Sequence, residues 1–201
     1  MIHLIIGIVG FQGDVDEHVR ATISAGKGRV KEVRDLRRTS DFRGVSGLII
    51  PGGESTTIYK LLINYGIYSK IKDEAEKGLP VMGTCAGLIL ISRDTGDPAV
   101  KGMGLIDAIV SRNAYGRQKE SFIGSVEIAG SGEFRAPFIR APKIVKVPES
   151  NIIGRCGDEP VMIRHNNVLG LTFHPELTRD TRLHSMFLEM VEGEGYISTG
   201  D

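Results

Sequence analysis

The fold of this chain is decided by residues 80–89, which read Pro80-Val81-Met82-Gly83-Thr84-Cys85-Ala86-Gly87-Leu88-Ile89. A short apolar strand is followed by a glycine, a cysteine, a second glycine and then an apolar helix. Glycines two residues before and two residues after a central side chain mark a strand-to-helix turn too tight for Cβ atoms. We therefore expect Cys85 at the apex of this turn, in a strained backbone conformation with its side chain pushed outward.

The position of Cys85 indicates a reactive thiol. It would stand at the N-terminus of the following helix, where the macrodipole and free N–H groups favour a thiolate over a thiol. A lone buried cysteine is more often an inert part of the core, but the two flanking glycines favour a nucleophile. The other cysteine, Cys156, lies in a polar Gly-Arg-Cys-Gly-Asp segment without such a turn, so we predict no catalytic role for it.

The segments on either side of this turn predict an α/β fold. In the first ninety residues apolar strands alternate with amphipathic helices, the order of a parallel sheet with right-handed crossovers. The second half has short strands bounded by Gly, Pro and Asn, which favour antiparallel additions to the sheet or a small side layer. The predicted strands are 2–9, 29–34, 48–50, 105–111, 121–128, 134–139, 143–147, 160–164 and 168–173. We find no repeat or linker, and we predict a single domain over residues 1–201 with a frayed tail from 193 onward.

The composition narrows the function classes. Lys+Arg and Asp+Glu are both 25 among 201 residues, and this zero net charge gives no support for binding to nucleic acid or to a membrane surface. No apolar run reaches the roughly 18 residues that a membrane helix needs, and the N-terminus reads as a first strand and not as a signal peptide. Two cysteines do not make a disulfide framework. The sequence therefore predicts a cytoplasmic protein.

A cysteine nucleophile needs a base, and one of the five histidines stands out. Pro175 disfavours the helical region at His174, so we expect Phe173-His174-Pro175-Glu176-Leu177 to be extended. Side chains two residues apart in an extended segment point to the same side, which would place the Glu176 carboxylate beside the His174 imidazole. The pair follows a predicted strand, where α/β enzymes gather their catalytic groups.

The loop Pro51-Gly52-Gly53-Glu54-Ser55-Thr56-Thr57 also follows a strand and opens a helix. Successive glycines let backbone N–H groups approach a ligand, and helix N-termini bind anions. We consider two interpretations. The loop holds a substrate carboxylate or supplies an oxyanion hole, or it is only a well-capped helix start with Ser55 as the cap. Asp14 is predicted to cap the first helix in the same way.

Taken in order, these blocks resemble class I glutamine amidotransferases, and more closely the glutaminase subunits of pyridoxal 5′-phosphate synthases. The resemblance spans residues 10–177. The block with Gly116-Arg117-Gln118 and the block with Ile139-Arg140-Ala141-Pro142 are the ones specific to that group. The matching blocks are Gly10-Phe11-Gln12-Gly13-Asp14 with Glu17-His18, Gly52–Thr56, Gly83–Ile89, Arg112-Asn113-Ala114-Tyr115-Gly116-Arg117-Gln118 with Ser121-Phe122, Phe138-Ile139-Arg140-Ala141-Pro142 and Phe173–Leu177. Phe11 and Tyr115 depart slightly from the common pattern, and 35–46 and 149–169 match loosely. The implied fold is a flavodoxin-like three-layer sandwich around a mostly parallel sheet.

The resemblance implies a mechanism and a set of site residues. Cys85 would attack the side-chain amide of glutamine while His174, oriented by Glu176, moves the protons; ammonia leaves, and water then releases glutamate from a thioester. The backbone N–H groups of Gly53 and Ala86 would line the oxyanion hole. The glutamine-binding positions would be Gly53, Glu54, Ser55, Arg112, Ile139 and Arg140. An arginine suits the substrate carboxylate because its planar fork binds it bidentately; an ordinary surface ion pair is the alternative for both arginines.

The resemblance also implies a partner in trans. Ammonia would pass to a (β/α)₈-barrel synthase subunit that builds the pyridine ring, and Gln12 would lie at the docking face. No metal and no cofactor are implied. We consider three alternatives: the glutaminase of another synthase, such as imidazole glycerol phosphate synthase, a cysteine hydrolase of the DJ-1/PfpI kind, and a redox-sensing or scaffold protein in which Cys85 is merely oxidisable.

Overall fold

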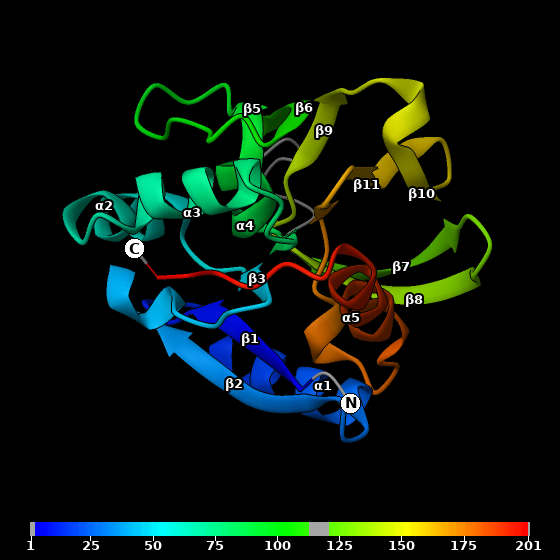
Figure 1. The fold of residues 1–201 in the computed structure, drawn as a ribbon. Helices are drawn as coiled ribbons and strands as arrows, with labels where there is room; N and C mark the ends of the chain where they lie inside the picture. Colours follow the sequence, from blue (N-terminus) through cyan, green and yellow to red (C-terminus); the bar gives the residue numbers. More distant parts are fainter. Residues whose placement is uncertain (1–2, 113–120, 201) are drawn as a thin grey trace.

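A computed structural model describes residues 3–112 and 121–200 of the chain, and its ribbon is drawn in Figure 1. Within these ranges nine strands form one sheet in the order β2-β1-β3-β4-β12-β11-β10-β7-β8. The bounds of these strands are β1 Leu4–Val9, β2 Val30–Leu36, β3 Gly47–Ile50, β4 Val81–Thr84, β7 Ser121–Ile128, β8 Gly132–Ile139, β10 Ile152–Cys156, β11 Glu159–His165 and β12 Val168–Leu171. The large mixed sheet confirms the predicted α/β class.

The two halves of the sheet differ in strand direction, as the sequence predicts. The strands β2, β1, β3, β4 and β12 pair in parallel, whereas β11, β10, β7 and β8 continue the sheet in antiparallel pairs. A separate three-stranded sheet holds β5 (Ser92–Asp94), β6 (Ile106–Ser111) and β9 (Lys143–Lys146). Both the antiparallel additions and a small side layer are therefore present.

Helices cover both faces of the sheet (Figure 1). The helices α2 (Ser55–Asn64), α3 (Ile67–Glu76) and α4 (Ala86–Ile91) pack into one apolar cluster, and α1 (Val15–Gly26) and α5 (Arg182–Glu194) into the other. Side chains alternate between the clusters along each central strand, because successive Cβ atoms in a strand point to opposite faces. In β3, for example, Leu48 and Ile50 belong to the first cluster and Ile49 to the second.

The structure corrects the sequence-based boundaries at several points. The strands β5 and β10 were not predicted, and the last strand, β12, ends at Leu171 and not at residue 173. Helix α2 ends at Asn64, and the next residue, Tyr65, is 55% exposed and stacks its ring on Phe11 at 5.1 Å. Short 3₁₀ turns occupy η1 Thr39–Phe42, η2 Glu149–Asn151 and η3 Pro175–Leu177.

The C-terminal segment is docked on the body of the protein, so the prediction of a frayed tail is wrong for the residues that the structure describes. The backbone of Ser198 exchanges two hydrogen bonds with the 44–45 segment, at 2.8 and 2.9 Å. The Tyr196 hydroxyl donates to Glu74 at 2.8 Å. Pairing of this kind holds a terminal segment that would otherwise fray. No described helix has the length and apolar character needed to cross a membrane.

The glycines of the strand-to-helix turn at Cys85, which we call the elbow, lead to a stability prediction. A Cβ added at Gly87 would lie 2.0 Å from the carbonyl oxygen of Ile50, whereas one added at Gly193 would meet nothing within 4 Å. We expect Gly87→Ala to lower the free energy of unfolding by about 1–3 kcal/mol, the usual cost of overpacking. Gly193→Ala, the matched helical control, should raise it by up to about 1 kcal/mol. Urea unfolding of both variants measures this, and equal stabilities would contradict the close packing of the elbow.

Candidate active site

Four loops meet at one edge of the sheet because they follow four adjacent parallel strands. The strands β1, β3, β4 and β12 are neighbours in that order, so their carboxyl ends lie side by side. The segments that leave these ends are Gly10–Asp14, Pro51–Glu54, the turn at Cys85 and the turn at His174. Parts of the chain up to 160 residues apart are thereby brought to one place.

Cys85 occupies the strained apex that the sequence predicts. Its φ and ψ are 48° and −103°, a positive-φ conformation outside the left-handed helical region that is uncommon for any residue other than glycine. A Cβ at Gly83 would lie 2.7 Å from the carbonyl of Gly87, so neither glycine can be replaced without moving the turn. The backbone N–H of Cys85 donates to Leu171 at 2.8 Å, which ties the elbow to the neighbouring strand β12.

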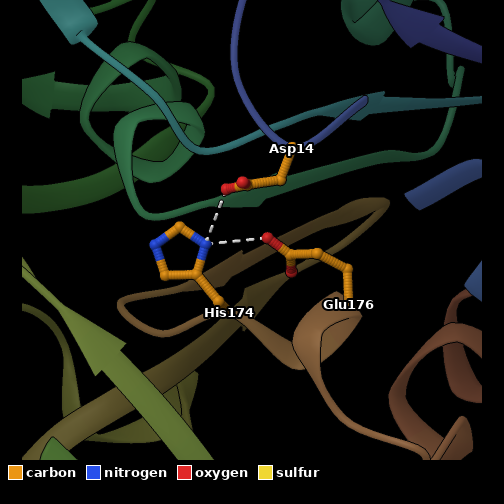
Figure 2. Close-up of side chains that lie close together, drawn as sticks. All are labelled: Asp14, His174 and Glu176. Carbon is orange, nitrogen blue, oxygen red and sulfur yellow. Dashed lines mark hydrogen bonds and ion pairs between the residues drawn. The ribbon is translucent and has the colours of Figure 1, made fainter. Parts of the chain in front are cut away.

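His174 and Glu176 lie together, but not for the predicted reason. The imidazole Nδ1 of His174 is 2.7 Å from Oε1 of Glu176, and both side chains are buried (Figure 2). The segment is not extended; His174 is the N-cap of the 3₁₀ turn η3, which starts at Pro175. Proline is well suited to the first position of such a turn. The tight turn, and not strand alternation, brings the carboxylate back to the ring.

Asp14 is a site residue that the sequence analysis missed. It stands at the N-cap position of α1, as predicted, but its side chain makes no capping hydrogen bond. Its Oδ2 lies 3.1 Å from Nδ1 of His174, the same ring nitrogen that Glu176 contacts (Figure 2). The sequence signal was the Gly13-Asp14 pair at the end of the loop between β1 and α1, which was interpreted as the start of a helix because Asp is common there.

The proton on His174 is held by its anionic neighbours. Burial on its own lowers the pKa of His174, but hydrogen bonds to Asp14, Cys85 and Glu176 outweigh burial and raise this pKa to about 12. Since both carboxylates contact Nδ1, Nε2 is the nitrogen left to face the sulfur of Cys85. The site therefore keeps His174 as a charged imidazolium at neutral pH, with the sulfur of Cys85 among its partners.

A second, uncharged layer lies behind the carboxylate of Glu176. Its Oε2 is 3.4 Å from Nε2 of His18 and has no hydrogen-bond partner among the described groups. His18 bonds Thr84 and His184 at 3.1 Å each. Burial lowers the pKa of His18 well below its usual value and that of His184 to about 4. Both rings are therefore neutral.

A cavity of about 290 Å³ opens beside Cys85, and most of the predicted substrate positions line it. Ile139 is the exception: its backbone oxygen lies 3.9 Å from the Cys85 sulfur, but its side chain is not part of the wall. Ile89 is an unpredicted member. The full lining is Gln12, Gly53, Glu54, Ser55, Cys85, Ala86, Ile89, Arg112 and Arg140.

The glycine loop caps helix α2 with a different residue from the one predicted. Glu54, not Ser55, is the N-cap, and its carboxylate accepts from the N–H groups of Thr56 and Thr57 at 3.3 and 2.7 Å. The hydroxyl and N–H of Thr57 and those of Thr56 lower the pKa of Glu54 to about 2. The hydroxyl of Ser55 is buried and has no hydrogen-bond partner among the described residues, although it lines the cavity.

The two predicted arginines reach the same cavity from the second half of the chain. Arg112 is bonded to Thr56 and Asp97 at 2.7 Å and to Glu54 at 3.2 Å, so it links the glycine loop to the side layer. Arg140 has a left-handed φ of 45°, a second strained non-glycine residue at the site. The rest of the Arg112–Gln118 block, Asn113 to Gln118, lies outside the described residues.

One group of described side chains has donor atoms close enough together to hold a metal ion. Donor atoms of Asp14, His174 and Glu176 all lie within 4.8 Å of one another. In this structure the same atoms pair with each other, because both carboxylates contact Nδ1 of His174, at 2.7 and 3.1 Å. The group is therefore better described as two carboxylates around a charged imidazole.

Comparisons with known proteins agree with this geometry. The sequence model of the SNO glutamine amidotransferase family matches residues 8–193. The chain is 51% identical to pyridoxal 5′-phosphate synthase subunit PdxT of Thermoplasma acidophilum over 198 residues, which cover 98% of each chain. It is 52% identical to the same subunit of Thermoplasma volcanium over 196 residues, 96% of this chain and 98% of that one.

Solved structures share the fold. A crystal structure of a glutamine amidotransferase superposes with a TM-score of 0.87 at 42% identity, covering 93% of this chain and 98% of the other. PurLQS from Thermotoga maritima has a TM-score of 0.64 at 19% identity, covering 96% and 97%, a likeness of fold alone. The family match over most of the length, with relatives above 50% identity, leads to one conclusion: this chain belongs to the SNO glutamine amidotransferase family.

Proposed function

We propose that this chain hydrolyses L-glutamine to L-glutamate and ammonia and works as the glutaminase subunit of a pyridoxal 5′-phosphate synthase. The carrying observation is that Cys85, strained at the apex of its turn, lies at the wall of a cavity, with the His174–Glu176 pair as its neighbour. The PdxT relatives, which match over nearly the whole chain, support the choice of synthase. We also propose one domain over residues 1–201, working in the cytoplasm, where both cysteines would stay free, as they are here.

The geometry supports nucleophilic catalysis in two steps. The Cys85 thiolate attacks the amide carbon, and the developing oxyanion is bound by the backbone N–H groups of Gly53 and Ala86, which both line the cavity. His174 gives its proton to the departing ammonia, which leaves a glutamyl thioester. Now neutral, His174 takes a proton from water, the hydroxide adds to the thioester, and glutamate departs as the thiolate re-forms.

The cavity wall supports recognition of the rest of the substrate. The buried Ser55 hydroxyl, which lacks a protein partner among the described groups, is available to a polar group of glutamine. Arg112 and Arg140 form the cationic part of the wall, to which we assign the substrate α-carboxylate. Glu54 remains ionised because its pKa is about 2, and it holds Arg112 in place.

The partner in this proposal is a (β/α)₈-barrel synthase subunit that receives the ammonia. Gln12 is exposed at the cavity, and its side-chain oxygen accepts from the N–H of Glu54 at 3.0 Å. A partner that contacts Gln12 can therefore act on the loop that carries Gly53. We propose that docking completes the oxyanion hole in this way.

The alternative functions are less well supported. A glutaminase of imidazole glycerol phosphate synthase would keep the same three catalytic residues, but the relatives at about half identity are PdxT subunits. A DJ-1/PfpI-like hydrolase would take its acidic residue from early in the chain; here the nearer carboxylate on His174 is Glu176, at 2.7 Å against 3.1 Å for Asp14. A redox or scaffold role leaves the arginine-lined cavity without a use.

We expect Cys85→Ala to abolish glutamate release from glutamine, since no other thiol is found among the described residues that line the cavity. Cys156→Ser is the matched control and should keep full activity, because Cys156 packs against the second apolar cluster away from the described cavity lining. A coupled glutamate assay on the complex with the cognate barrel subunit measures both. Ammonia release that persists in Cys85→Ala would overturn the mechanism.

The proton state of the site gives a spectroscopic prediction. His174 should stay protonated through neutral pH because its pKa is about 12, whereas His18 and His184 should stay neutral because burial lowers theirs. Nitrogen-15 NMR of ring-labelled protein between about pH 6 and 9 should show His174 as an imidazolium and His18 and His184 as neutral rings, with none of these three titrating. Titration of His174 near 6.5 would contradict the ion pair.

We expect the cognate barrel subunit to raise glutaminase kcat by on the order of a hundredfold, about what one oxyanion-hole donor contributes. Gln12→Ala should lose most of this increase. Asn166→Gly is the control, because Asn166 precedes β12 at the opposite end of the strands and glycine suits its φ of 49°. Equal stimulation of Gln12→Ala and wild type would show that docking acts elsewhere.

A further inference from the structure

Two carboxylates share one imidazole nitrogen in this site. Nδ1 of His174 lies 2.7 Å from Oε1 of Glu176 and 3.1 Å from Oδ2 of Asp14 (Figure 2). We propose that Asp14 is a second positioning residue for His174, so that the ring is oriented by a pair of carboxylates and not by Glu176 alone. This inference rests on the proposed glutaminase function, in which His174 is the proton carrier.

The side chain of Asp14 is committed to His174 and not to its helix. An Asp at an N-cap ordinarily accepts from the N–H of the second or third helical residue. Here the first turn of α1 closes through backbone groups, with Val15 donating to Gly13 and His18 to Asp14 at 2.8 and 3.1 Å. The Asp14 side chain makes no capping bond. A purely structural role at the helix start therefore does not explain its orientation.

The surrounding backbone leaves room for this contact only because two glycines are present. A Cβ at Gly52 would lie 2.3 Å from Cε1 of His174 and 3.2 Å from Oδ2 of Asp14. A Cβ at Gly13 would lie 1.7 Å from the carbonyl oxygen of Gly52. The loops after β1 and β3 thus pack closely around the ring. The loop after β1 carries Asp14, and the imidazole packs against Gly52 in the loop after β3.

The two carboxylates differ in surroundings. The Glu176 side chain is fully buried, and burial raises its pKa against the opposing effect of His174. The Asp14 side chain is 34% exposed, and its hydrogen bond to His174 lowers its pKa, so Asp14 is the firmly ionised member. Nδ1 carries one proton for two acceptors. Loss of either acceptor therefore leaves the other to hold the same tautomer and ring orientation.

Asp14 also ties His174 to the cavity mouth. Two residues before it, Gln12 lines the cavity and accepts from the N–H of Glu54. A ligand or partner that moves Gln12 moves the short loop that carries Asp14. The same loop thus reaches both the oxyanion-hole segment and the proton carrier.

The test compares single and double variants in the complex with the cognate barrel subunit. Asp14→Asn and Glu176→Gln should each lower kcat by on the order of tenfold, because each removes one hydrogen bond to a charged group. The KM for glutamine should not change. The double variant should lose on the order of 10⁴, as a catalytic histidine does without its orienting carboxylate. This loss exceeds the product of the single losses. Circular dichroism verifies folding.

The pH dependence of kcat/KM distinguishes a positioning role of Asp14 from a purely structural one, which would leave this profile unchanged. Removal of the Asp14 charge should lower the pKa of His174, so the alkaline limb of kcat/KM shifts to lower pH. The other titratable groups at the ring are Cys85 and Glu176, with the neutral pair His18 and His184 behind Glu176, and Asp14→Asn leaves them all in place. Asp14→Ser, which also keeps a favoured N-cap residue, should shift the limb in the same direction.

Asp16→Asn is the matched control, since Asp16 is an exposed acid in the first turn of the same helix. It should keep the wild-type rate and pH profile. An Asp14→Asn protein with a wild-type profile, or a double variant no slower than Glu176→Gln or equal to the product of the single losses, would overturn the inference. The proposed glutaminase function is tested separately. It is supported if wild type and Asp16→Asn both show glutaminase activity that requires Cys85, and it is overturned if neither protein has this activity.

Discussion

The site depends on the parallel pairing of β4 with β3 on one side and β12 on the other. Parallel neighbours end at the same edge of a sheet, about 5 Å apart. This pairing alone brings the thiol of Cys85, the glycine loop after Ile50 and the ring of His174 within reach of one another. The hydrogen bond from the Cys85 backbone to Leu171 ties the strained apex to the strand that leads to His174. Any slip in this register would separate the nucleophile from its proton carrier.

Electrostatics divides three buried histidines into two kinds. Burial disfavours the charged form of all of them. His18 and His184 have each other and a hydroxyl as ring partners, and they stay neutral. His174 is flanked by two carboxylates and a sulfur, and their combined attraction outweighs its burial. A charged, oriented imidazole is thus maintained in a nearly dry place, where its interactions with a developing charge are least screened.

Much of the site could be predicted from local sequence, and the errors share a cause. Paired glycines predicted the elbow because a turn of that shape excludes Cβ atoms. The segment from His174 to Glu176 was correctly paired but wrongly drawn as extended, since Pro175 also suits the first residue of a 3₁₀ turn. Asp14 was assigned to its helix and Ser55 to a cap. Asp14 instead contacts His174, which lies far away in the sequence, and Glu54 takes the capping position in place of its neighbour Ser55. Local sequence preferences cannot rank such competing partners.

The sequence by itself determined the α/β class, the strained turn at Cys85, and the residues that line most of the cavity. The class and the turn follow from short-range rules, because periodicity, glycine sterics and strand-to-helix order act within a few residues, whereas the cavity residues were implied by the resemblance of the sequence blocks to glutamine amidotransferases. Only the tertiary structure decided that a second carboxylate, from Asp14, contacts His174. It also decided that the C-terminal segment docks at Ser198 and that two neutral histidines lie behind Glu176. These contacts join residues 122 to 166 positions apart, and pairing over such distances is set by strand order and packing, not by local propensity.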